Sequence, residues 1–293
     1  MMINQFLDYL RYERNASPQT VQTYDESLRE FESYLGLRDT GLSLQTVDAD
    51  LIRDWMESLM DKGNTASTIN KKLSALRSFY RFSLKRGLVE KDPAHGLVGP
   101  KKSKPLPQFV REGEMDRLLD QLQWGNDYKD VRARTILLLF YEAGLRRSEL
   151  TGLNDADVDF GSRQLKVTGK RNKQRIIPFG EELAETLSRY LAIRDEQFGK
   201  CEGAMFLDDK GKRMTGDQVY AIVRKNLSLV TSLKKRSPHV LRHTFATAML
   251  NNGAGLESIK SLLGHESVST TEIYAHTTFE QLKRIYKEAH PRA

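Results

Sequence analysis

The amino-acid sequence predicts a mainly α-helical protein of two domains, with one small antiparallel β-meander in the second domain. Three observations predict this fold. The length of 293 residues corresponds to about two domains at roughly 150 residues each. Apolar residues recur at helical spacing through nearly all of residues 1–91. Three short strand-like runs follow one another only after a segment rich in proline and lysine.

Four helices are predicted in the N-terminal domain, residues 1–91. The second of them starts at Ser17-Pro18, because serine is a favourable N-cap and proline fits the first helical position. Asp48 provides a similar start for the third helix, and glycines end the second, third and fourth helices. The four predicted helices cover residues 3–13, 17–36, 48–63 and 67–87.

Residues 92–108 are predicted to form an interdomain linker. This segment holds four of the eight prolines of the chain and three lysines, and its apolar residues follow no period. The second domain is therefore expected to cover residues 109–293.

The second domain is expected to be mixed, with helices on both sides of the β-meander. Thr215 with Gln218 forms a capping box at the start of one helix, and Ser237-Pro238 starts another. From residue 181 onward the pattern is helical. Before that point, the predicted helices cover 112–123 and 131–143, and the predicted strands cover 158–160, 164–167 and 175–179.

The net charge of +7 favours a polyanionic partner, and its distribution is uneven. Residues 1–103 carry 15 basic and 14 acidic residues, whereas residues 104–293 carry 31 and 25. No apolar run reaches the roughly 18 residues that a membrane span needs, and the N-terminal residues do not resemble a signal peptide. Cys201 is the only cysteine, so no internal disulfide can form, and we expect a cytoplasmic protein without a membrane partner.

Cofactor and metal motifs are incomplete, so no cofactor and no metal are expected. The phosphate-binding GxxxxGK[ST] motif is missing. His239 and His243 have the spacing of zinc-protease ligands, but Val240 stands where the general-base glutamate would be, which leaves zinc a minor alternative. The run Asp155–Asp159 imitates the start of a calcium loop without its glycine or final glutamate, and we interpret it as a solvated turn that enters the sheet.

One helix start combines groups that favour phosphate. Pro238 places His239 and Arg242 three residues apart in the first turn, where free backbone N–H groups and the helix dipole attract anions. An imidazole and a guanidinium there could both donate to phosphoryl oxygens. The alternative is that the two side chains only cap the helix and pair locally.

Four further residues have both a functional and an ordinary interpretation. Arg146 begins an element after Gly144 and could reach a phosphate or lie on the surface. Lys170, at a hairpin tip, could protonate a leaving oxygen or remain solvated. His265 follows a helix-ending glycine, and Tyr274 lies in a helix where a tyrosine usually serves packing.

The order and spacing of these residues resemble the tyrosine recombinases, the phage-integrase-like family, and most of all its cellular Xer branch. The resemblance spans the whole chain. It rests on the segments AGLRRSEL, VTGKRNKQRIIPFG, SPHVLRHTFATAML, LLGHESVSTTEIYAH and HPRA.

The resemblance implies a catalytic role for each of six residues and an orienting role for a seventh, Glu149. Tyr274 would be the nucleophile that attacks a DNA phosphodiester and forms a 3′-phosphotyrosyl bond. Lys170 would protonate the departing 5′-oxygen, and Glu149 would orient the site. Arg146 and Arg242 would clamp the phosphate oxygens, and His239 and His265 would add hydrogen bonds and proton transfer.

The resemblance also implies a C-shaped clamp around duplex DNA that carries a specific recombination site. Family members act as tetramers, so the resemblance implies a homo- or hetero-tetramer, with a paralogous recombinase and an activating DNA translocase as candidate partners. The last helix, around residues 282–286, would dock on a neighbouring subunit. The implied function is resolution of chromosome dimers at segregation, without ATP. The alternatives are a mobile-element integrase, a type IB topoisomerase-like nicking-closing enzyme, and a DNA-binding regulator that has lost the chemistry.

Overall fold

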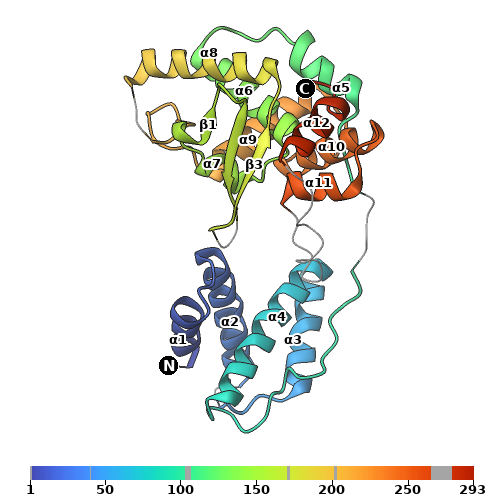
Figure 1. Ribbon diagram of the computed structural model, residues 1–293. Helices are drawn as coiled ribbons and strands as arrows, with labels where there is room; N and C mark the ends of the chain where they lie inside the picture. The colour runs from blue at the N-terminus through green and yellow to red at the C-terminus, as the bar shows by residue number, and fades with distance from the viewer. Residues whose placement is uncertain (1, 40, 103–106, 170–171, 201–202, 265–278) are drawn as a thin grey trace. The chain divides into compact units, whose positions relative to one another are not determined.

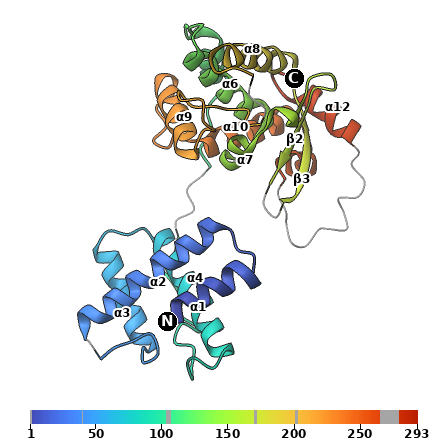
Figure 2. The ribbon, with the colours of Figure 1, turned by 90° about the vertical axis from the view of Figure 1, so that its left-hand side faces the viewer.

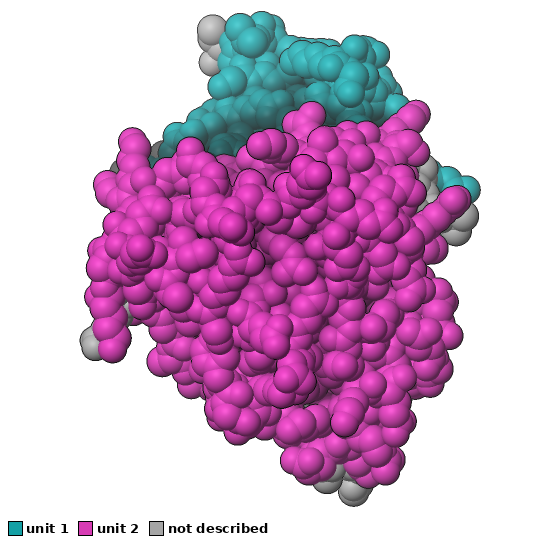
Figure 3. Space-filling model, turned by 90° about the horizontal axis from the view of Figure 1, so that it is seen from above, with its two compact units in different colours: residues 1–105 teal, residues 106–293 magenta. Residues whose placement is uncertain are grey.

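The computed structural model divides the chain into two compact units, Met1–Pro105 and Leu106–Ala293, which Figure 3 distinguishes by colour. The structure describes residues 2–39, 41–102, 107–169, 172–200, 203–264 and 279–293. Three of the predicted catalytic residues, Lys170, His265 and Tyr274, lie outside these ranges.

The N-terminal unit contains the four predicted helices. Ser17 caps the second by accepting from the Thr20 amide, and Asp48 caps the third by accepting from the Leu51 amide. The fourth begins at Ala66, one residue earlier than expected, because Thr65 provides its N-cap. The helices are α1 (Met2–Asp8), which continues as the π-helical turn η1 (Tyr9–Glu13), α2 (Pro18–Arg38), α3 (Ala49–Asp61) and α4 (Ala66–Lys85).

Part of the segment predicted as linker packs against this helical unit. Ala94 and Leu97 are buried in its hydrophobic core. The side-chain amide of Asn70 on α4 donates to the carbonyl of Pro100 at 2.8 Å, and Arg77 donates to the carbonyl of Leu97. Four prolines in a short stretch remove helical periodicity but do not prevent a chain from packing in an extended conformation.

The C-terminal unit combines eight α-helices in the described part with a small sheet. The three strands form an antiparallel sheet in the order β1–β2–β3, with Leu165 opposite Ile177. The predicted meander is therefore confirmed, with strand ends within one residue of those expected. Its elements are α5 (Glu112–Asp116), η2 (Arg117–Gln121), α6 (Tyr128–Ala143), α7 (Arg147–Gly152), η3 (Asp155–Asp157), β1 (Val158–Asp159), β2 (Gln164–Thr168), β3 (Gln174–Pro178), α8 (Glu181–Phe198), α9 (Gly216–Val230), α10 (Pro238–Asn251), α11 (Leu256–Leu263) and α12 (Phe279–Ala289).

Helix α6 forms the centre of the C-terminal unit, between α8 and α10 (Figures 1 and 2). It begins at Tyr128, three residues before the predicted start, because Asp127 accepts from the Asp130 amide and caps it. Its buried residues occupy every side of the helix, which is typical of a helix in the middle of a core.

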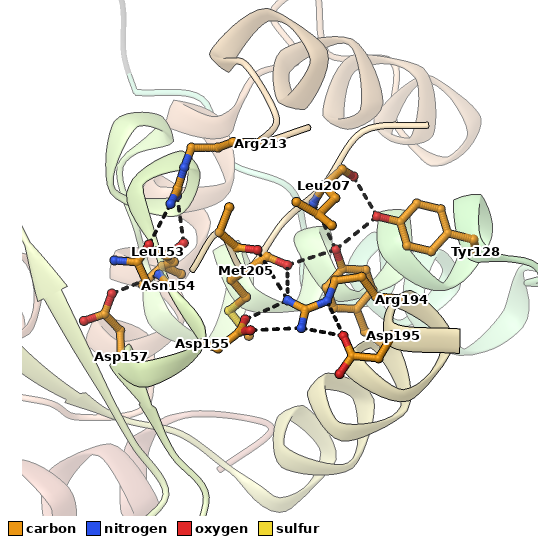
Figure 4. Close-up of polar contacts among 12 residues, drawn as sticks. Tyr128, Leu153, Asn154, Asp155, Asp157, Arg194, Asp195, Met205, Leu207 and Arg213 are labelled. Atoms are coloured by element: carbon orange, nitrogen blue, oxygen red, sulfur yellow. Dashed lines mark hydrogen bonds and ion pairs between the residues drawn. The ribbon is translucent and has the colours of Figure 1, made fainter. Parts of the chain in front are cut away.

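One buried arginine, Arg194, joins α8 to the turn before the sheet through several hydrogen bonds and ion pairs (Figure 4). The guanidinium of Arg194 binds both oxygens of Asp155 at 2.7 and 2.9 Å, and it also pairs with Asp195. It donates further to the carbonyls of Ala204 and Met205. The interpretation of the Asp155–Asp159 run as a solvated turn is therefore wrong for its first residue, which is the counter-ion of a buried arginine.

Helix α12 packs on its own C-terminal unit, beside α10 and α11 (Figure 1). The hydroxyl of Tyr286 donates to Oε2 of Glu142 at 3.2 Å, and the amide of Gly180 donates to the same oxygen. The ring of His290 stacks on Tyr286 and approaches the carbonyl of Tyr141. The last helix thus packs on the chain that carries it, and its docking on a neighbouring subunit stays a prediction.

This contact buries two titratable groups whose pKa values are shifted in opposite ways. Burial raises the pKa of Glu142 from 4.5 to about 8, and the charge of Glu182 adds to this, while the Gly180 amide, the Tyr286 hydroxyl and Arg292 oppose it. Burial lowers the pKa of His290 from 6.5 to about 4. Both side chains are therefore neutral in the folded protein near neutral pH.

Glu142→Gln should remove a loss of stability between pH 6.5 and pH 8. In this range the folded chain keeps a proton on Glu142 that the unfolded chain releases, so the free energy of unfolding falls by up to about 1.4 kcal/mol per pH unit. Near pH 6.5 His290 binds a proton only in the unfolded chain, and this contribution is the same in wild type and in Glu142→Gln, so it cancels from their comparison. Urea unfolding at pH 6.5 and pH 8 measures the effect, with Glu185→Gln on the exposed face of α8 as control. Equal slopes for wild type and Glu142→Gln would contradict this account.

Candidate active site

The site begins at the turn between α6 and α7. Gly144 ends α6 with a φ of 56°, and a Cβ at this position would lie 2.6 Å from the ring of Phe245. Only glycine fits this conformation and this space. Arg146 follows as the N-cap residue of α7, so its backbone amide and its side chain both face the start of a helix.

Glu149 fixes Arg146 at two points. Its Oε2 accepts from the backbone amide of Arg146 at 2.8 Å, and its Oε1 accepts from Nη1 of the same residue at 2.6 Å. The predicted role of Glu149 as an orienting residue agrees with these contacts. The Glu149 side chain is only 1% exposed, so its charge has to be balanced by the cations around it.

Arg242 reaches the same turn from α10. It is 7% exposed, and it donates from Nη1 to the carbonyl of Gly144 at 2.6 Å and from Nη2 to the carbonyl of Leu263 at 2.5 Å. Burial, followed by the charges of Arg146 and Arg175, lowers the pKa of Arg242. A guanidinium nevertheless stays charged at neutral pH, so Arg242 is a buried cation beside the carbonyls of Gly144 and Leu263.

His239 lies one turn before Arg242 on α10 and is exposed. Partial burial of the ring and the charges of Lys235, Arg242, His243 and Arg147 lower its pKa. A lowered pKa keeps the imidazole neutral near neutral pH, where it can both accept and donate a proton.

The end of helix α11 joins the arginines to one another. The last carbonyls of a helix lack partners within the helix and carry the negative end of its dipole. Three consecutive carbonyls there each accept from a different arginine. The pairs are Arg175 Nε to Leu262 at 2.8 Å, Arg242 Nη2 to Leu263 at 2.5 Å, and Arg146 Nη2 to Gly264 at 2.8 Å.

Arg175 is a member of this site that the sequence analysis missed. Its Nη1 and Nη2 bind the two oxygens of Glu149 at 2.8 and 2.9 Å. It lies on β3, and the sequence analysis treated it only as a strand residue. One signal was present in the sequence: Arg175 stands two residues before the buried Ile177, and side chains two apart on a strand share a face. A charged residue on the inward face of a strand needs a buried partner.

The electrostatic balance of the site is positive. Burial raises the pKa of Glu149, but hydrogen bonds and charge from Arg175, and then hydrogen bonds from Arg146, lower it to about 2. Arg242 Nη1 stands 3.9 Å from Oε2. One ionised carboxylate therefore faces three guanidiniums, an excess of positive charge suited to an anion such as a phosphodiester.

The residues that directly precede two of the undescribed candidates, Lys170 and His265, lie at this site. A Cβ on Gly169 would be 3.4 Å from Glu149 Oε1 and 3.9 Å from Arg146 Nη1, and Lys170 follows Gly169 in the sequence. Gly264, which ends α11 with a φ of 63°, accepts from Arg146 and precedes His265. The structure thus brings Arg146 and Arg242 together, places His239 on the same helix as Arg242, and leaves Lys170, His265 and Tyr274 undescribed.

Within the described ranges, no group of three or more histidine, cysteine, aspartate or glutamate side chains is placed to hold a metal ion. Among the helices that the structure describes, none is long and apolar enough to cross a membrane.

Comparison with known proteins identifies the family of both units. Residues 108–281 match the phage integrase family, and residues 3–87 match the phage integrase N-terminal SAM-like domain. The chain belongs to the phage integrase family. The expected identity as a tyrosine recombinase of this family, and the mainly α-helical fold with a small antiparallel sheet, are confirmed.

Relatives of this phage integrase family chain match it over nearly its whole length. It is 39% identical to tyrosine recombinase XerC of Chlorobaculum tepidum, over 99% of this chain and 94% of the relative. It is 36% identical to XerC of Pelotomaculum thermopropionicum, over 99% and 98%. Its fold resembles XerH recombinase bound to a palindromic difH substrate, with a TM-score of 0.72, 20% identity, and coverage of 99% of this chain and 82% of that one.

Proposed function

We propose that this chain is a site-specific DNA recombinase that cleaves and rejoins double-stranded DNA through Tyr274 and resolves chromosome dimers at segregation. The relatives named tyrosine recombinase XerC support the activity, and the XerH structure in complex with difH substrate supports DNA as the partner. The observation that carries the proposal furthest is the meeting of Arg146 and Arg242 at one buried carboxylate, which leaves excess positive charge beside the end of α11.

In the proposed reaction, the Tyr274 hydroxyl attacks a DNA phosphorus and the bond from phosphorus to the 5′-oxygen breaks. The products are a 3′-phosphotyrosyl ester and a free 5′-hydroxyl. Lys170 gives the departing oxygen its proton, and His239 or His265 takes up the tyrosine proton. Arg146 and Arg242 bind the two non-bridging oxygens, where charge grows in the transition state. Rejoining is the reverse transfer onto another 5′-hydroxyl, and the ester bond conserves the energy for it.

We further propose an assembly of several recombinase subunits on DNA. The recombinase would act in the cytoplasm as a homo- or hetero-tetramer on two copies of a specific site, with a paralogous recombinase and an activating DNA translocase as candidate partners. The two units would close around duplex DNA as a C-shaped clamp. The N-terminal domain, residues 1–91, and the catalytic domain, residues 109–293, would both contact DNA, connected through residues 92–108.

A plasmid assay separates this function from its alternatives. Duplexes that the full chain selects from a random library supply a candidate site, and a supercoiled plasmid then carries two direct repeats of it. A recombinase converts this plasmid into two circles and leaves a plasmid without the site supercoiled. Relaxation of the site-free plasmid would instead show a topoisomerase-like enzyme, and binding with no change of either plasmid would show a regulator without chemistry.

A further inference from the structure

Arg175 connects the small sheet to the cluster formed by Arg146, Glu149 and Arg242. From β3 it donates Nε to the α11 carbonyl of Leu262 and both Nη atoms to Glu149, so that all three of its nitrogens are engaged. Its side chain is 14% exposed. These hydrogen bonds fix the orientation of the Arg175 guanidinium, because the planar group binds a carboxylate through two parallel hydrogen bonds.

This pairing keeps Glu149 from binding Arg242. Oε2 of Glu149 already accepts from Arg175 Nη2 and from the backbone of Arg146, and Arg242 Nη1 remains 3.9 Å away, beyond hydrogen-bond distance. Arg242 donates instead to two backbone carbonyls. Neutral carbonyls hold a guanidinium less strongly than a carboxylate does.

The guanidiniums of Arg146 and Arg242 therefore retain donors. Each guanidinium carries five N–H groups. To acceptors in the described part of the chain, each of the two donates only two side-chain hydrogen bonds. The remaining N–H groups are the ones with which each arginine can bind a phosphate oxygen.

We propose that Arg175 is a positioning residue for DNA cleavage, which occupies Glu149 and fixes the end of α11 so that Arg146 and Arg242 can bind the scissile phosphate. This inference rests on the proposed recombinase function. Without Arg175, a buried carboxylate that has lost its bidentate partner draws Arg242 and Arg146 toward itself. The loss of Arg175 also leaves the Leu262 carbonyl without its donor. Leu262 lies two residues before Gly264, whose carbonyl accepts from Arg146.

Arg134 provides a matched control within the same unit. Like Arg175 it is partly buried, donates Nε to a helix carbonyl, that of Leu119, and pairs with a glutamate, Glu182. In the described part of the chain it forms no hydrogen bond or ion pair with Glu149, Arg146 or Arg242. Its replacement therefore removes a similar set of structural contacts and leaves the proposed phosphate site intact.

The test measures single-turnover cleavage of a nicked duplex carrying the selected site, between pH 5 and pH 8, together with DNA-binding affinity. We expect Arg175→Gln to slow cleavage by about 10²-fold, the typical loss when transition-state donors are misplaced, with affinity changed by no more than about threefold. Its activity should also fall at acidic pH where wild type stays active, because burial raises the pKa of Glu149 and the lowering by Arg175 is lost. Arg175→Lys keeps the charge without the bidentate geometry and should recover part of the rate.

Thermal melting identifies variants that are folded, and Arg134→Gln reports the effect of lost structural contacts alone. A wild-type rate and pH profile in folded Arg175→Gln would overturn the inference, as would the same change of rate and profile in Arg134→Gln. If Arg175→Gln does not fold, Arg175→Lys is used for the test instead. A wild-type rate of cleavage and a wild-type pH profile in Arg175→Lys would then overturn the inference. Absence of cleavage by the wild-type chain would instead overturn the recombinase function on which the inference rests.

Discussion

Arg242→Ala and Arg146→Ala are each expected to slow DNA cleavage by about 10³-fold, with DNA-binding affinity reduced by less than about tenfold. Both guanidiniums are held at the end of α11 by hydrogen bonds to its terminal carbonyls. They are positioned before DNA binds, so their contribution should be greatest when charge develops on the phosphate. Affinity depends on many phosphate contacts, of which these arginines supply few.

The measurement is single-turnover cleavage and equilibrium binding on the same duplex, with melting temperatures for each variant. Arg242→Lys serves as a second variant, because Arg242 is buried and its loss leaves the carbonyls of Gly144 and Leu263 without that donor. Arg189→Ala, on the exposed side of α8, is the control and should cleave at the wild-type rate. Variants of Arg146 and Arg242 that bind poorly but cleave normally once bound would make both arginines docking residues.

Glu149→Ala is expected to destabilise the C-terminal unit by about 3–5 kcal/mol, the usual effect of removing one partner from a buried ion pair. The variant leaves Arg175, Arg242 and Arg146 without the carboxylate that balances them. It should also lose cleavage activity, because the backbone amide and the side chain of Arg146 are both held by this carboxylate. Urea unfolding at pH 7 measures the first effect, and unchanged stability would contradict the proposed charge balance.

The pH dependence gives Glu149 a second test with a definite sign. Its pKa is lowered from 4.5 to about 2 in the folded chain, so its contribution is fully present above pH 4.5 and is lost as the pH falls toward 2. Glu149→Gln should lack this loss. Glu142, the other glutamate that is buried in the described part of the unit, has its pKa raised, so its contribution to the free energy of unfolding falls as the pH rises. Glu149→Gln should therefore lower the free energy of unfolding near neutral pH, whereas Glu142→Gln should remove its decline between pH 6.5 and pH 8.

Much of the fold could be predicted, because helix starts depend on local chemistry. Ser17, Asp48 and Thr215 each cap a helix through a hydrogen bond to an amide three residues later, which spacing alone indicates. Burial was harder to predict. Nothing local shows that Ala94 and Leu97 fill the core of the N-terminal unit, or that Asp155 balances Arg194 from α8. Such pairings depend on tertiary structure.

In the candidate site, too, some residues could be predicted from the sequence and others depend on tertiary contacts. Arg146 and Arg242 were predicted from their order in the chain, and the turn at Gly144 explains why residues so far apart in sequence meet. Arg175 escaped prediction, because its role depends on three hydrogen bonds, to Glu149 of α7 and Leu262 of α11, that only the folded chain brings together. The docking of α12 on its own unit, where the Tyr286 hydroxyl donates to Glu142, likewise depends on a tertiary contact that no local pattern in the sequence shows.

The most direct test of the proposed chemistry is the covalent adduct itself. Wild-type chain incubated with a nicked duplex of its selected site should give a protein–DNA species that survives denaturation. Proteolysis and mass spectrometry should then locate a 3′-phosphate linkage on Tyr274. Tyr274→Phe should give no such species while still binding the duplex. An undiminished adduct from Tyr274→Phe, a linkage to the 5′ end, or no adduct from wild type would contradict the proposed mechanism.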